Sequence, residues 1–233
     1  MRSPFVRGMI HGIPIALGYL SVSFGFGILA VRIGLTVPAA VSISMTNLTS
    51  AGQTAGLEII AAGGTLLEMA LTQLIINLRY ALMGFSLSQK LDDTFTTPRR
   101  LLVSFGITDE IFAVAISQPE ELTVRYMAGL ILTPWIGWAS GTALGAAAGQ
   151  LLPAMVSNAM GILLYGMFLA LIVPPAKKDR RVLGVVVLAA AFSAVCRYLL
   201  PGLSGGFAVI VSALAASLIG ACFFPPDDEE ESA

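Results

Sequence analysis

Charged residues are scarce in this chain. Asp, Glu, Lys and Arg make up 12% of its 233 residues, whereas hydrophobic residues make up 56% and the mean hydropathy is +0.85. Soluble domains carry about 25% charged residues. The composition therefore argues against a soluble fold and predicts an all-α integral membrane protein, whose hydrophobic surface faces the lipid bilayer.

Cysteine and histidine are rare as well. Cys196 and Cys222 lie in apolar runs without metal-ligand spacing, so we expect two small buried side chains rather than a disulfide. Residues 202–206 match the G-x-S-x-G pattern, which requires a base near the serine. The one histidine, His11, is predicted on the opposite side of the membrane, so we expect Ser204 to cap a helix.

These scarcities exclude several classes of function. The chain carries no catalytic constellation and no cluster with metal-ligand spacing, so the sequence predicts neither an enzyme nor a bound cofactor or metal. Lys and Arg form no continuous basic stripe, which argues against a nucleic-acid partner.

Eight apolar runs, separated by charge clusters or by Gly and Pro, are candidate transmembrane helices. They are 12–31, 37–62, 66–87, 101–117, 125–152, 159–173, 182–200 and 206–224. The run 37–62 also fits two half-helices, and the run 159–173 is short. We expect one transmembrane domain over residues 1–225 and a disordered acidic tail over 226–233.

Basic residues predict the orientation of these helices. Arg2 and Arg7 precede the first run, and four basic residues follow the sixth within 177–181. An even number of crossings puts both groups on one side, so the positive-inside rule places the N- and C-termini in the cytoplasm. The basic residues of the loop 90–100 would then lie outside, against the rule.

Glycine recurs at every fourth position in the run 125–152. Gly137, Gly141, Gly145 and Gly149 form one smooth stripe on a helix, where a second helix can approach closely. We interpret the stripe as a packing surface. Its partner is either another helix of this chain or a second subunit.

Charges within the predicted spans are the strongest functional signal. They are Glu58, Glu68, Arg79, Asp109, Glu110 and Arg197. A charge at the bilayer centre costs roughly 2.5–3.5 kcal/mol on insertion scales, so such residues pair, become neutral or face a wet cavity.

Asp109 and Glu110 are neighbours, so on a helix their side chains point about 100° apart. At most one of the two acids can therefore face Arg79. Our hypothesis is that one acid pairs with Arg79 while the other lines a transport pathway or carries a proton. The alternative is a structural ion pair that holds two helices together.

The run 37–62 contains a polar stretch, 42–54, that is too rich in Ser, Thr, Asn and Gln for a lipid-facing helix. Irregular backbone at membrane depth is tolerated only inside protein or along a water-filled cavity. Broken helices of this kind supply binding sites in transporters. The stretch therefore predicts a broken helix, with an intact buried helix as the alternative.

Four short motifs resemble those of the AzlC family. Ser50-Ala51-Gly52-Gln53 resembles its element around an Ala-Gly pair, and 76–80 (Ile-Asn-Leu-Arg-Tyr) resembles its NLR-[HY] element. Thr108-Asp109-Glu110 resembles its TDE element. Gly18-Tyr19 with Phe24-Gly25 resembles its N-terminal signature. The motifs follow the family's order, although Tyr80 stands where many relatives have histidine.

The resemblance implies a function and a setting. It implies the large subunit of a two-component exporter of branched-chain amino acids, which acts with a small hydrophobic partner of the AzlD type. It further implies a bacterial or archaeal cytoplasmic membrane and export driven by an ion gradient.

Together, residues and resemblance predict a site for a zwitterionic amino acid. Arg79 or a half-helix N-terminus near Gln53 would take the carboxylate, and Asp109 or Glu110 the ammonium. The main candidates are Gln53, Asn77, Arg79, Thr108, Asp109 and Glu110, with Ser50, Gly52, Glu58, Glu68 and Tyr80 as secondary candidates. A transporter of another small solute and a structural membrane scaffold are the alternatives.

Overall fold

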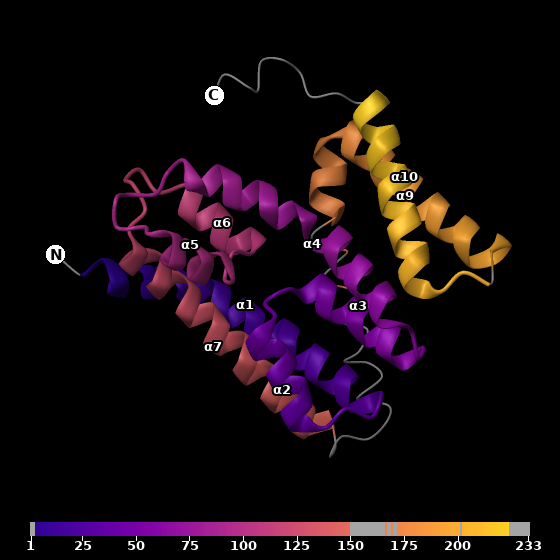
Figure 1. The fold of residues 1–233 in the computed structure, drawn as a ribbon, viewed down its shortest axis with the longest axis horizontal. Helices are drawn as coiled ribbons and strands as arrows, with labels where there is room; N and C mark the ends of the chain where they lie inside the picture. Colours follow the sequence, from indigo (N-terminus) through magenta and orange to yellow (C-terminus); the bar gives the residue numbers. More distant parts are fainter. Residues whose placement is uncertain (1–2, 150–165, 167–168, 170–171, 201, 224–233) are drawn as a thin grey trace. The chain divides into compact units, whose positions relative to one another are not determined.

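The computed structural model describes residues 3–149, 166, 169, 172–200 and 202–223 (Figure 1). Within them, regular structure is helical apart from one β-bridge between Leu91 and Leu122, so the predicted all-α class is confirmed. The helices are α1 (Pro4–Arg32), α2 (Val37–Thr46), α3 (Ser50–Ala61), α4 (Leu66–Ser88), α5 (Thr97–Ser104), α6 (Asp109–Ile116), α7 (Val124–Gly149), α9 (Arg180–Leu199) and α10 (Gly205–Phe223).

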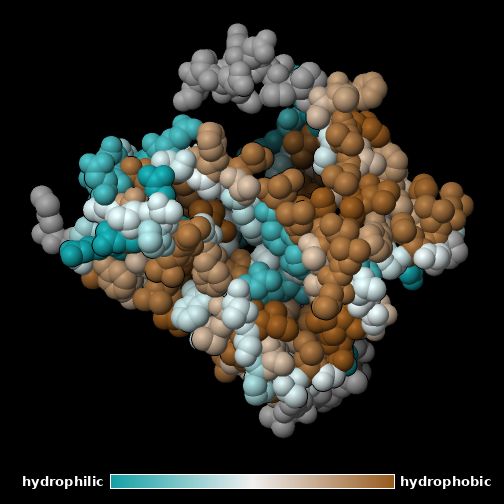
Figure 2. Space-filling view, viewed as in Figure 1, coloured by the Kyte–Doolittle hydropathy of each residue, from teal (hydrophilic) through white to brown (hydrophobic). Residues whose placement is uncertain are grey.

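Four helices are long and apolar enough to cross a membrane: α1, α4, α9 and α10. They correspond to the predicted runs 12–31, 66–87, 182–200 and 206–224. Hydrophobic side chains also cover much of the visible surface (Figure 2), as expected of a protein that meets lipid. Most of the predicted run 159–173, and the whole tail 226–233, fall outside the described residues.

Two predicted runs are each split into two helices. The run 37–62 forms α2 and α3, which are separated at residues 47–49, so the broken-helix interpretation is confirmed. The prediction of a single helix over 101–117 is wrong, because α5 ends at Ser104 and α6 begins at Asp109. Thr108 caps α6 by accepting the Ile111 N–H at 3.4 Å, and a threonine N-cap favours a new helix start.

The helices form two compact units. The first comprises Met1–Leu57 and Ile76–Leu164, and the second Glu58–Ile75 and Tyr165–Ala233. Helices α3 and α4 contribute residues to both. A single transmembrane domain over 1–225 remains a prediction.

In the first unit, α1 and α7 pack along the glycine stripe. A Cβ on Gly137, Gly141 or Gly145 would lie 2.0–2.6 Å from backbone oxygens of α1, and one on Gly149 would lie 2.8 Å from the side chain of Val31. No side chain fits at the first three positions without moving the helix backbone. The partner of the stripe is therefore α1 of the same chain.

In the second unit, α9 and α10 pack together. Cys196 of α9 is buried, and its sulfur accepts a hydrogen bond from the Ser212 hydroxyl of α10 at 3.9 Å. Cys222 is exposed near the end of α10, so the prediction that both cysteines are buried is wrong for this one. Because α10 is hydrophobic all round, its sequence pattern does not distinguish the buried face from the exposed one.

The glycine stripe generates a stability prediction. Gly141→Ala would place a methyl group 2.3 Å from the Leu20 carbonyl oxygen, and we expect overpacking to cost about 1–3 kcal/mol. Gly18→Ala is the matched control, because a Cβ at that exposed position of α1 meets nothing within 4 Å. Thermal unfolding in detergent should show a lower midpoint for Gly141→Ala only. Equal midpoints would contradict the close α1–α7 contact.

Candidate functional site

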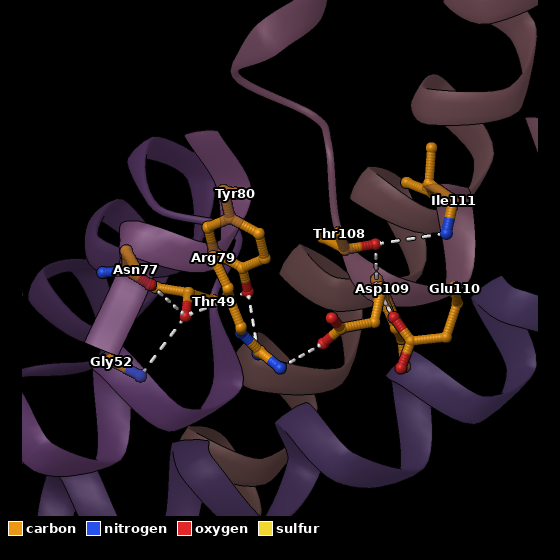
Figure 3. Close-up of polar contacts among 10 residues, drawn as sticks. Thr49, Gly52, Asn77, Arg79, Tyr80, Thr108, Asp109, Glu110 and Ile111 are labelled. Atoms are coloured by element: carbon orange, nitrogen blue, oxygen red, sulfur yellow. Dashed lines mark hydrogen bonds and ion pairs between the residues drawn. The ribbon is translucent and has the colours of Figure 1, made fainter. Parts of the chain in front are cut away.

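The break between α2 and α3 is organised by Thr49, which is buried. Its hydroxyl oxygen accepts the Gly52 N–H at 3.3 Å and so caps the N-terminus of α3. The hydroxyl also donates to Asn77 Oδ1 at 2.9 Å and accepts from the Tyr80 hydroxyl at 3.3 Å. The start of α3 is thereby tied to α4 (Figure 3).

Gln53 holds the two halves of the broken helix together. Its side-chain amide nitrogen donates to the backbone oxygens of Asn47 and, at 3.4 Å, Ile43, which lie where α2 ends. Its side-chain oxygen accepts from Trp138 Nε1 of α7 at 3.2 Å. Gln53 is 3% exposed, so its polar atoms serve the break rather than an open surface.

The break between α5 and α6 has a similar construction. Thr108 caps α6, and its buried hydroxyl is hydrogen-bonded to the Tyr19 hydroxyl of α1 at 2.6 Å. Tyr19 also donates to Glu110 Oε2 at 2.6 Å. At both breaks, therefore, a threonine caps the start of the second helix, and a tyrosine from a neighbouring helix is hydrogen-bonded to that threonine.

An ion pair joins α4 to α6. Arg79 Nη1 lies 2.8 Å from Asp109 Oδ2, and the two side chains are 45% and 39% exposed (Figure 3). The guanidinium also lies over the Tyr80 ring, 5.0 Å from its centroid, and donates to the Tyr80 hydroxyl at 3.3 Å. Because both side chains are partly exposed, their charges are accessible to a ligand.

The structure brings together most of the main candidates predicted from the sequence. Asn77, Arg79, Thr108, Asp109 and Glu110 belong to the polar network around the two breaks. The pairing hypothesis agrees with this geometry: Asp109 faces Arg79, and Glu110 faces α1 instead.

The secondary candidates separate into two groups. Ser50 and Gly52 lie in the first turn of α3, and Tyr80 contacts Arg79. Glu58 and Glu68 belong to the second unit instead.

Within that unit Glu58 is exposed, whereas Glu68 is buried. The Glu68 carboxylate accepts from the Ser204 hydroxyl and from the Gly206 N–H, at the start of α10. A carboxylate there is stabilised by the helix N-terminus.

Three residues of the network, Thr49, Tyr19 and Trp138, were not among the site candidates predicted from the sequence. Thr49 directly precedes a helix start, and the N-cap preference for threonine is the signal that identifies its position. Tyr19 is a hydroxyl-bearing residue in the middle of an apolar helix. Trp138 gave no signal, because its indole resembles any other large apolar side chain in that run.

An apolar cavity of about 240 Å3 lies within the first unit, between α4, α5 and α7. Its lining includes Gly84, Leu87, Phe95, Val103 and Ile107. Gly84 follows Tyr80 by four residues, so the cavity lies along the face of α4 that carries Tyr80. A Cβ on Gly84 would meet only Ile107, at 3.9 Å, so the glycine leaves open space.

Comparisons with known proteins agree on one family. The model of the AzlC protein family matches residues 14–152, which include both helix breaks and the Arg79–Asp109 pair. The chain is 28% identical over 205 residues to "Inner membrane protein YgaZ" of Escherichia coli (strain K12), covering 84% of this chain and 83% of that protein. It is 32% identical over 175 residues to an "Uncharacterized membrane protein" of Archaeoglobus fulgidus, covering 74% and 76% respectively.

No solved structure matches the chain. The family match covers more than half of the sequence, and the two relatives are named as membrane proteins. The resemblance of the four short motifs is thereby confirmed: the chain belongs to the AzlC family and is a multi-pass protein of the cytoplasmic membrane.

Proposed function

We propose that this chain is the large subunit of a secondary active exporter of branched-chain amino acids. Its substrates are Val, Leu, Ile and Met, export is coupled to an ion gradient, and a small AzlD-type membrane subunit acts with it. Both termini face the cytoplasm. The observation that carries the proposal is the accessible Arg79–Asp109 pair between the two helix breaks.

An ion pair of this kind complements a zwitterion. The Arg79 guanidinium presents a planar set of donors that suits a carboxylate, and the Asp109 carboxylate accepts from an ammonium. Without substrate Arg79 and Asp109 compensate each other, so neither of these two charges is left unpaired when the site is empty. An incoming amino acid replaces one ion pair with two.

The apolar cavity supports the substrate class. It follows the Tyr80 face of α4, starting one turn beyond the residue that stacks on Arg79. Its open volume of about 240 Å3 accommodates a branched aliphatic side chain, and its lining is largely apolar, although Ser88, Thr97, Arg100 and Ser104 also border it. One methylene changes binding in such a pocket by only about 1–3 kcal/mol, which is consistent with export of several similar amino acids.

Substitutions of the ion pair test the proposed site. Asp109→Asn and Arg79→Ala each remove one charge that holds the substrate, and we expect a loss of about 2 kcal/mol or more, roughly thirtyfold in affinity. Binding of radiolabelled leucine to the purified complex measures this. Glu120→Gln is the control, because the Arg7–Glu120 pair has the same 2.8 Å separation outside the site.

The same variants have a cellular readout. Cells that lack the chain and its partner should accumulate Val or Leu when fed dipeptides, and the wild-type pair should relieve the accumulation. Asp109→Asn and Arg79→Ala should not relieve it at equal expression. Normal export by both variants would contradict the charge-pair mechanism.

Substitutions of Gly84 test the apolar part of the site. Gly84→Ala adds a methyl group at ordinary contact distance from Ile107, so we expect nearly normal leucine transport. Gly84→Leu fills the cavity without touching the ion pair, so leucine transport should fall more than alanine transport. The ratio of leucine to alanine exchange in proteoliposomes measures the effect. An unchanged ratio would show that the side chain binds elsewhere.

A further inference from the structure

The two adjacent acids at the start of α6 have different environments. Asp109 is paired with Arg79 of α4, whereas Glu110 accepts a hydrogen bond from Tyr19 of α1. Within the part of the chain that the structure describes, Glu110 is not paired with a lysine or an arginine. The charge of Asp109 is therefore compensated by a cation, and that of Glu110 is not.

The contact with Tyr19 lies deep in the first unit. Tyr19 is close to the middle of α1, a 29-residue helix long enough to cross the membrane, and it is 8% exposed. Its ring packs edge-on against Trp138 of α7, with the ring centroids 5.2 Å apart. The Tyr19 hydroxyl is thus held in place, while Glu110 itself is exposed and can be reached from the surface.

Few other charged or titratable groups face Glu110. Asp109 precedes it on α6, and Arg79 and Tyr80 approach from α4. The titratable groups of α7 are in its first turn: exposed Arg125, and Tyr126, which is bonded to His11. The positive charges near Glu110 are the N-terminus of α6, which Asp109 shares, and Arg79, which is paired with Asp109.

We propose that Glu110 binds the proton that is exchanged for the substrate, and that Tyr19 is its positioning residue. This inference rests on the proposed export function and assigns different tasks to the two acids. Asp109, already compensated by Arg79, takes the substrate ammonium. Glu110, whose charge no described cation compensates, becomes neutral by taking up a proton.

Proton binding would change how α6 is attached to α1. The carboxylate of Glu110 only accepts hydrogen bonds, so the Tyr19 hydroxyl donates to it, and the Thr108 hydroxyl can donate to Tyr19. A protonated Glu110 can still accept from Tyr19 through its unprotonated oxygen, but the bond loses its charge assistance and becomes weaker. The capped start of α6, which carries Asp109, is then held less firmly against α1, and this links the proton to the substrate site.

Glu110→Gln tests the assignment, because glutamine can still accept from Tyr19 but cannot take up a proton. The chain is reconstituted with its small partner subunit, and two leucine fluxes are measured. One is exchange of labelled external for unlabelled internal leucine without a gradient. The other is uptake of labelled leucine driven by an acidic vesicle interior. We expect Glu110→Gln to retain exchange while gradient-driven uptake falls to the level seen without a gradient.

The outcomes separate this inference from the export function. Gradient-driven uptake by Glu110→Gln at the wild-type level overturns the assignment, as does wild-type uptake driven by sodium but not by a pH gradient. Loss of both fluxes in Glu110→Gln also overturns it, because Glu110 would then be needed for binding itself. Absence of both fluxes in the wild type refutes the export function instead, and this inference with it. Glu120→Gln is the matched control and should retain both fluxes.

Tyr19→Phe tests the positioning role. Phenylalanine keeps the packing against Trp138 but removes the donor to Glu110. We expect leucine exchange to persist, while the pH at which gradient-driven uptake is half-maximal changes. Tyr126→Phe removes another buried tyrosine hydroxyl, the one bonded to His11, and should change neither flux. An unaltered pH profile in Tyr19→Phe would overturn the role of Tyr19.

Discussion

Backbone hydrogen bonding is the constraint on which the rest of this structure depends. A helix that ends inside a membrane exposes backbone N–H and C=O groups that lipid cannot satisfy. The predicted spans 37–62 and 101–117 are each interrupted, and side chains satisfy backbone groups at both breaks. Thr49 and Thr108 accept N–H groups where α3 and α6 begin, and Gln53 donates to the carbonyls where α2 ends.

The polar side chains at the breaks in turn bring charged residues together. Tyr80 contacts both Thr49 and Arg79, and Tyr19 contacts both Thr108 and Glu110. The groups that close the helix breaks therefore also position the groups that would bind substrate and proton. The glycine contact between α1 and α7 supports this arrangement, because it keeps Tyr19 against Trp138 and close to α6.

Much of the fold was predictable from local pattern. The helical membrane class follows from the scarcity of charge, and the break in the run 37–62 from its Ser, Thr and Asn content. The break in the run 101–117 was missed, because hydropathy averages over residues 105–108 and one capping threonine hardly changes the average. Cys222 was wrongly predicted to be buried for a similar reason, because an apolar run does not indicate which of its faces is covered by other helices.

The sequence predicted which residues belong to the candidate site, but not which side chains contact each other there. The sequence by itself determined that Arg79, Asp109 and Glu110 are too costly to leave isolated at membrane depth, and that adjacent acids must point in different directions. Only the tertiary structure decided that Asp109 faces α4 while Glu110 faces α1, and that the glycine stripe packs within the chain. Charge and helical periodicity are local properties, whereas the choice of partner depends on which helices the packing brings into contact.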